Sequence, residues 1–317
     1  SLTDKIEAMW RQKDFDPDAH RAILDDLQQN GSIASLPLKE CVKAYSHLQN
    51  VVIYKARCDN GWNAQDKNQD GQTDQKLVVD ESRYPDEINL LHQINGRFQH
   101  SPALEAWVSR GRRGLTDELR DDNFAAHSFN WGKLNMAQKN DVLTSLVHRQ
   151  MQKFAGDEFS FVMPEIIIED DPAAPTAYSS PNGDFIGFNK KLLESPDGFQ
   201  PLGLAFHESM HAALSQLSLL QKSGELPPNH PLYEDAKMFV ARRESCGASL
   251  PDIFDVYMSD PEEKLAYSQQ DRFNFSLYRE KTLKSLFTER AMDAEKYMEL
   301  NSPRLSGALR TIGLFPT

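Results

Sequence analysis

Apolar residues recur every three or four positions through the first half of the chain, which is the spacing of amphipathic helices. Three groups each share one helical face: Ile6, Met9 and Trp10; Ile23, Leu24 and Leu27; and Cys41, Val42, Tyr45 and Leu48. The same spacing predicts further helices over residues 87–98, 103–109 and 136–154. A polar stretch at 59–83 interrupts the pattern. The first 155 residues are therefore predicted to form a mainly helical region.

The pattern changes after Gly156, where β-branched and aromatic residues gather in short runs. Residues 159–162 and 165–169 are predicted as one pair of strands, and 176–179 and 185–188 as a second pair. The second pair encloses Pro-Asn-Gly-Asp, whose residue types favour a chain reversal. Helical spacing then continues to the end of the chain. We therefore predict an α+β fold that is mostly α, with a helical N-terminal region over 1–155 and a second domain over 156–317.

Composition narrows the class of protein. The 317 residues suffice for one large or two moderate domains, and 39% hydrophobic with 26% charged residues is typical of a soluble globular protein. The net charge of -12 argues against nucleic acid and anionic membranes as partners, because both attract basic proteins. No apolar run approaches the roughly 20 residues of a transmembrane helix, so we expect no membrane span.

Cysteine usage leaves the redox compartment open. Cys41, Cys58 and Cys246 form no C-x-x-C pair, and an odd, sparse set is not a disulfide framework. A bridge between Cys41 and Cys58 and three buried thiols both fit the sequence. No targeting segment is visible, and the chain begins at Ser1 rather than Met, as a trimmed form would.

The most informative stretch is 202–214, which places an H-E-x-x-H array inside an otherwise apolar helix. Residues four apart share a helix face, so His207 and His211 point the same way, as two ligands of one tetrahedral zinc must. Glu208 can then lie beside the metal without binding it. The alternative is a core helix whose two histidines are satisfied by neighbouring groups. Burying these polar groups without a strong partner would be costly, so we favour the metal.

This arrangement resembles the zincin superfamily of zinc metallopeptidases, in its H-E-x-x-H helix and in the strand pair 176–188 that precedes it. In zincins such a pair forms the sheet edge beside the cleft, where an extended peptide binds by strand addition. The resemblance covers about residues 157–275 and implies a zincin-like catalytic domain. Leu214 and Leu217 replace the glycine and third histidine of metzincins. The resemblance is therefore gluzincin-like, with a glutamate from a later helix as third ligand.

By this resemblance the third ligand is Glu263, because residues 260–267 contain a Glu-x-x-Ala-Tyr array similar to the third-ligand helices of gluzincin-like families. Helical spacing favours Glu262 instead, since it falls on the apolar face of that predicted helix. Glu234, at the start of the first helix after the motif, is nearer in sequence. Glu244 is expected to pair with a neighbouring arginine. All of these alternatives stay open at the level of the sequence.

The chemistry implied is zinc-dependent hydrolysis of a peptide bond in a protein or peptide substrate. His207, His211 and Glu263 would hold zinc, whose open fourth position takes a water of lowered pKa. Glu208 would accept a proton from this water and later donate it to the leaving amine. Tyr267, one turn beyond Glu263, is expected to help stabilise the oxyanion.

Other assignments remain. Tyr178, Arg243 and His230 are weaker candidates for the oxyanion donor. A catalytically inactive zincin-like binding protein and a zinc hydrolase of a non-peptide substrate are the alternative functions. The intact Glu208 argues against the inactive protein, because zinc binding alone does not need that residue.

An acidic loop suggests a second metal. Asp66, Asn68, Asp70 and Asp74 provide oxygen ligands around a glycine, as in the first half of a calcium loop. Leu77 stands where a bidentate glutamate belongs, and a solvated polar loop is the simpler interpretation. Calcium there would favour a calcium-rich setting outside the cytoplasm. We expect an exported protein: periplasmic, secreted or delivered as an effector.

Overall fold

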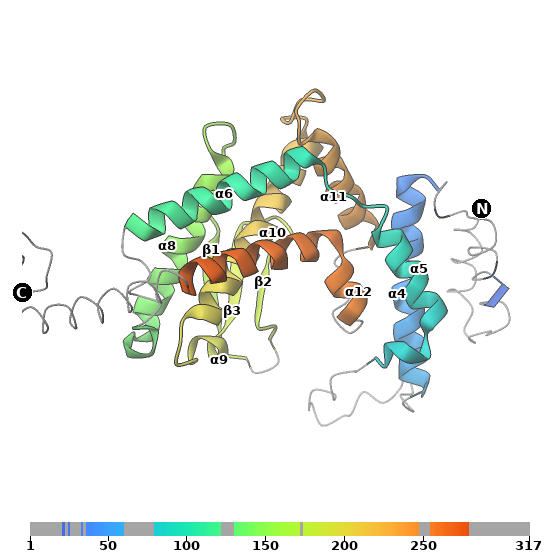
Figure 1. Cartoon of the computed structure of the whole chain (residues 1–317), viewed down its shortest axis with the longest axis horizontal. Coiled ribbons are helices and arrows are strands. Elements are labelled where there is room, and N and C mark those ends of the chain that lie inside the picture. Colours follow the sequence, from blue (N-terminus) through green and yellow to red (C-terminus); the bar gives the residue numbers. More distant parts are fainter. Residues whose placement is uncertain are drawn as a thin grey trace, which may run out of the picture.

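A computed structural model describes residues 36–59, 79–121, 130–171, 174–246 and 254–278, together with residues 21, 22, 25 and 33 (Figure 1). The side chains that mark the first two predicted helices lie outside the described residues, as does the acidic loop at 66–74. The described part is mostly helical with one small sheet, which confirms the α+β, mostly α, fold class. None of the helices in these ranges is long and apolar enough to cross a membrane.

The predicted N-terminal helices are present where the structure describes them. They are α4 (Leu38–Asp59), α5 (Pro85–Asn95), α6 (Pro102–Asp121) and α8 (Met136–Ala155), with short 3-10 turns η1 (Glu81–Arg83) and η2 (Trp131–Lys133). The start of α8 is fixed by a capping box, in which the Asn135 side chain accepts from the Gln138 N–H and the Gln138 side chain accepts from the Asn135 N–H. The apolar face predicted for α4 is buried: Cys41, Val42, Tyr45 and Leu48.

A three-stranded sheet follows, formed by β1 (Glu165–Glu169), β2 (Ala177–Ser179) and β3 (Phe185–Asn189) in the order β1-β3-β2. The antiparallel pairing of β2 with β3 confirms the second predicted strand pair. Strand β1 pairs with β3 in parallel. Because β3 is central, β2 lies at an edge of the sheet.

The prediction of a strand at residues 159–162 is wrong. These residues form no regular secondary structure and do not join the sheet. The Val162 N–H donates to Gln216 Oε1 at 2.6 Å, and Gln216 Nε2 donates to the Val162 carbonyl at 2.7 Å. One side-chain amide thus satisfies both main-chain groups that a neighbouring strand would have paired. Apolar alternation cannot distinguish these two partners.

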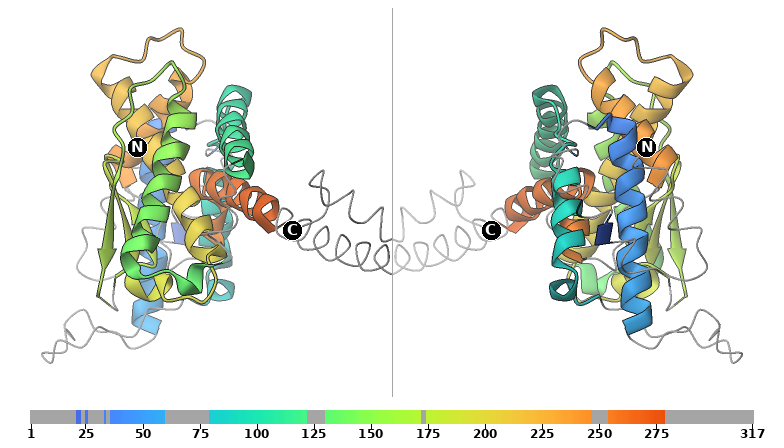
Figure 2. Two further views of the ribbon diagram at one scale, coloured as in Figure 1. Left: turned by 90° about the vertical axis from the view of Figure 1, so that its left-hand side faces the viewer. Right: turned by 90° about the vertical axis from the view of Figure 1, so that its right-hand side faces the viewer.

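The remaining helices are α9 (Lys190–Leu193), α10 (Phe199–Ser223), α11 (Tyr233–Cys246), α12 (Phe254–Ser259) and a helix over 261–278. Helix α10 is buried along most of its length and packs against β2, β3, α8 and α11. The sheet lies on one side of α8 and α10, and α6 with the 261–278 helix lies on the other (Figure 2).

The 261–278 helix runs antiparallel to α10. A Cβ on Gly203 would meet the Asn274 side chain at 2.7 Å, and the rings of Phe206 and Phe273 are stacked 4.8 Å apart. The first turn of this helix therefore arrives beside the second half of the H-E-x-x-H array. The missing side chain at Gly203 permits the close approach.

One hydrophobic core joins the two predicted domains. Trp107 on α6 packs on Phe154 of α8 with ring centroids 4.9 Å apart, and its indole N–H donates to the Phe154 carbonyl. Helix α8 in turn packs on α10, and α4 packs on α11. The boundary near residue 155 stays a prediction, but the helices before it are covered by those after it.

Candidate metal centre

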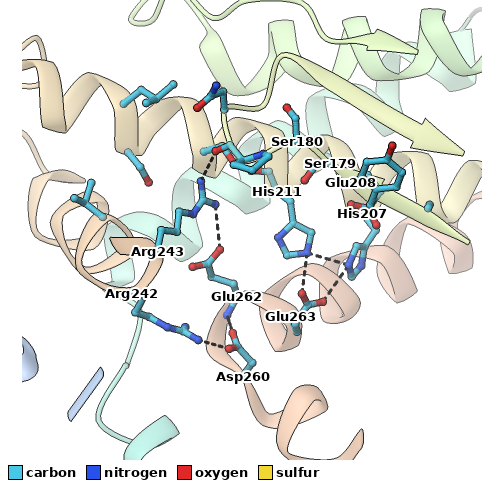
Figure 3. A pocket seen from close by; sticks show the side chains of 18 of the residues that line it. Ser179, Ser180, His207, Glu208, His211, Arg242, Arg243, Asp260, Glu262 and Glu263 are labelled. Carbon is cyan, nitrogen blue, oxygen red and sulfur yellow. Dashed lines mark hydrogen bonds and ion pairs between the residues drawn. The ribbon is translucent and has the colours of Figure 1, made fainter. Parts of the chain in front are cut away.

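His207 and His211 come together because α10 is regular over their sequence. Residues four apart stand one above the other on a helix face. Their Nε2 atoms lie 3.0 Å apart. Figure 3 shows the two rings side by side, joined by a dashed line. The predicted convergence of the two imidazoles is thus present. Two neutral imidazole nitrogens cannot both accept, so a proton or a cation must lie between them.

Glu263 completes a three-sided group. Its carboxylate oxygens lie 3.3 Å from His207 Nε2 and 3.5 Å from His211 Nε2 (Figure 3). Ligands bound tetrahedrally to zinc at about 2.0–2.1 Å stand about 3.3 Å from each other. The observed separations match that spacing. Together His207, His211 and Glu263 could hold a metal ion.

Burial and charge at this group also fit a cation. Glu263 Oε2 is buried in the described part of the chain and lies 3.3 Å from His207 Nε2. Burial by itself raises the pKa of Glu263, but the charges and hydrogen bonds of His211 and His207 together outweigh burial and hold that pKa far below its usual range. Burial by itself lowers the pKa of His211, whereas the Glu263 carboxylate raises it to about 9. The group therefore favours a bound positive charge.

Helix packing decides between the alternative glutamates. Glu263 shares a face with Ala266, which is fully buried, and this face meets α10. The Glu262 carboxylate turns away and accepts from Arg243 Nη2 at 3.3 Å. Glu234 is exposed on α11 and lies 3.5 Å from Lys237 Nζ. The sequence spacing that favoured Glu262 misjudged which side of the helix meets α10.

Glu208 lies in the same site without belonging to the ligand group. Its side chain is buried, and its carboxylate accepts a main-chain hydrogen bond from Ser179 on β2. Burial raises the pKa of Glu208 above its ordinary value. A buried carboxyl with a raised pKa holds a proton more readily than an exposed one, as a group that accepts and returns a proton must. No pattern in the sequence indicated Ser179.

The β2–β3 turn is pressed against α10 next to His211. Gly183 has φ +69°, and a Cβ at this position would lie 2.4 Å from the Ala212 carbonyl oxygen. Only glycine permits both this conformation and this contact. Gln216 Nε2 also donates to the Gly183 carbonyl at 2.7 Å. The turn thereby holds β2, and with it Ser179, beside the H-E-x-x-H helix.

A cavity of about 730 Å³ opens beside the three ligand side chains. One wall is the edge strand β2 with the turn after it, and another is α10 beyond His211. The third comes from α11 and from residues 257–263. Ser215 and Ser218 on α10 donate their hydroxyls to carbonyls of their own helix, so this wall presents few free polar groups. The cavity is large enough to bury several side chains of a ligand.

Tyr257, which the sequence analysis missed, lines this cavity, whereas Tyr267 is not among its lining residues. The Tyr257 hydroxyl hydrogen-bonds to Glu263 and to Tyr267, and burial raises its pKa above the ordinary value. The Tyr267 ring packs on the His207 ring with centroids 4.4 Å apart. Tyr267 therefore packs on one member of the candidate metal group, and its predicted catalytic role stays a prediction. Only proximity to Glu263 in sequence could have indicated Tyr257.

The weaker candidates lie at different places. Tyr178 lines the cavity, but its hydroxyl donates to Glu169 at 2.6 Å. Arg243 also lines it and reaches the Pro181 carbonyl at 3.4 Å. His230 lies 2.6 Å from a Glu158 oxygen and is not among the lining residues. The side chains of Glu244, Cys58 and Cys246 lie outside the described part, so the predictions for them stay predictions.

Comparisons with models of protein families, with curated proteins and with solved structures each found no match to this chain. The interpretation of the site therefore depends on its own geometry.

Proposed function

We propose that this protein is a zinc-dependent metallopeptidase. The observation that carries the proposal is the convergence of His207, His211 and Glu263 at the spacing of tetrahedral ligands, with the Glu208 carboxyl buried beside them. Two imidazoles and one carboxylate form a donor set typical of catalytic zinc, which keeps one position open. Zinc is favoured over calcium or magnesium because these harder ions prefer oxygen ligands alone.

The side chains of the site would have different roles in the reaction. When bound, a zinc ion would lower the pKa of a water molecule and polarise the substrate carbonyl. Glu208 would accept a proton from the attacking water and return it to the leaving amine. Its hydrogen bond to Ser179 orients the carboxylate. Tyr257 lines the cavity, and its hydroxyl would hold the Glu263 carboxylate in position.

The edge position of β2 supports a peptide as substrate. Among the described residues, the order β1-β3-β2 leaves one side of β2 without a neighbouring strand, and β2 lines the cavity. An extended peptide could pair with that edge and place a scissile carbonyl at the ligand group. A side chain of the bound peptide would then pack against the cavity wall formed by α10.

The test is the Glu208→Gln variant, with metal content and hydrolysis of an unfolded protein measured side by side. We expect about one zinc per chain in both wild type and variant, and activity reduced by about 10²- to 10⁴-fold in the variant, because the general base is lost. A chelator should abolish the wild-type activity. Glu234→Gln is the matched control, since this exposed carboxyl lies outside the site.

The outcomes separate the alternatives. Unchanged activity in Glu208→Gln would refute the general-base assignment. Zinc binding without any cleavage of unfolded proteins would favour a binding protein or a hydrolase of another substrate. A wild-type protein that takes up no transition metal would overturn the whole proposal.

A further inference from the structure

The helix that supplies Glu263 is held in place by α5, from the N-terminal region. Helix α12 and residue 260 connect to that helix, and α12 lies between it and α5 (Figure 1). Asn95, at the end of α5, is buried. Its Nδ2 donates to the Ser259 hydroxyl at 2.9 Å and to the Val256 carbonyl at 3.3 Å. One side chain thereby fixes the last turn of α12.

Two histidines from the same region add contacts to the same segment. His92 Nδ1 lies 2.9 Å from the Ser259 hydroxyl, and His100 Nε2 lies 2.8 Å from the Pro261 carbonyl. The His100 contact reaches the first residue of the 261–278 helix. Four hydrogen bonds from α5 and the segment after it thus converge on residues 256–261.

The start of the ligand helix is fixed by a buried ion pair. Asp260 Oδ1 accepts the Glu262 N–H at 2.9 Å, which is a helix N-cap, and the other carboxylate oxygen pairs with Arg242. The Arg242 guanidinium lies over the Phe98 ring at 5.0 Å, so the segment after α5 also packs on this pair. Both charged side chains are buried. The direction in which the first helical turn projects Glu263 is therefore determined on several sides.

Helix α12 also contacts the ligand itself. Its Tyr257 hydroxyl hydrogen-bonds to the Glu263 carboxylate. A partner of this kind orients a metal-binding carboxylate and fixes its position before the metal arrives. The chain of contacts runs from Asn95 through α12 and Tyr257 to Glu263.

We propose that Asn95, His92 and His100 are positioning residues of the metal centre. Through them, the N-terminal helical region sets the metal affinity, because it holds α12 and the first turn of the 261–278 helix in place. This inference rests on the proposed function, since it takes Glu263 to be a metal ligand. His207 and His211 are placed by the local geometry of α10. Glu263 comes from a separate helix, so its position depends on these long-range contacts.

The experiment compares zinc dissociation constants, measured in the full chain by competition with a chromophoric chelator. Asn95→Leu removes the amide at similar volume, and Ser259→Ala removes the hydroxyl that Asn95 and His92 share. We expect the dissociation constant of Asn95→Leu to rise by about 10- to 100-fold, as for loss of other groups that orient metal ligands. The absorption of the Co²⁺-loaded variants should shift towards that of Glu263→Ala. Ser259→Ala should show the same changes to a smaller degree.

Trp107→Phe is the matched control. It also leaves a buried main-chain carbonyl without its side-chain donor, but between α6 and α8. It should lose stability and keep the wild-type zinc affinity and Co²⁺ spectrum.

Zinc affinities of Asn95→Leu and Ser259→Ala equal to that of the control would overturn the inference, and Ser259→Ala decides alone if Asn95→Leu does not fold. Absence of zinc binding in the wild type would instead overturn the metal centre itself.

Discussion

The packing of the β2–β3 turn against α10 leads to a quantitative prediction for Gly183→Ala. Two costs add at this position. An L-residue held at φ +69° is strained by about 1–2 kcal/mol. A Cβ placed 2.4 Å from the Ala212 carbonyl oxygen forces the turn and α10 apart, at roughly 1–3 kcal/mol. We expect the free energy of unfolding to fall by about 2–5 kcal/mol in total.

Gly224→Ala separates the two costs. Gly224 has φ +83°, and a Cβ there would meet nothing within 4 Å. This variant should therefore lose only the strain of about 1–2 kcal/mol. Urea denaturation of the two metal-free variants measures their free energies of unfolding. The difference between them is the cost of the contact between the turn and α10.

Gly183→Ala should reduce the peptidase activity more strongly than it reduces the affinity for zinc. Moving the turn away from α10 carries Ser179 away from Glu208, while His207 and His211 stay on their helix. Peptidase assays and zinc titrations of Gly183→Ala measure the two effects. If Gly183→Ala unfolds with the same free energy as Gly224→Ala, the close approach of the turn does not hold and the reasoning is refuted.

Three further predictions concern charge and metal. Arg242→Met should destabilise the protein by about 3–5 kcal/mol, because it leaves the buried Asp260 carboxylate uncompensated; urea denaturation should show partial recovery on adding Asp260→Asn. Chelation should lower the melting temperature of zinc-loaded protein, since zinc at 1,000 times its Kd stabilises by about 4 kcal/mol; His211→Ala should show no such shift in calorimetry. In metal-free protein the pKa of His211 is raised to about 9, so protonated His211 stabilises the folded state. This contribution to the free energy of unfolding is complete at pH values below the ordinary pKa of histidine and disappears as the pH rises through 9. Unfolding in a chelator from pH 6 to 10 should show this loss, and Glu263→Gln should remove it.

The sequence alone determined the features that depend on local geometry. The two histidines converge because a regular helix places residues four apart on one face, and the β2–β3 pair forms around a turn whose residue types favour reversal. The helices at 136–154 and after residue 37 follow from apolar spacing in the same way. Each of these depends on neighbours within a few positions of the chain.

The tertiary structure alone decided the rest. Glu263 rather than Glu262 meets the histidines because the 261–278 helix approaches α10 through Gly203. Val162, in the predicted strand 159–162, pairs with the Gln216 amide rather than with a strand. Tyr257 joins the site for the same reason. These outcomes depend on contacts between segments far apart in the chain, and the spacing of residue types within one segment carries no information about which distant segment will meet it.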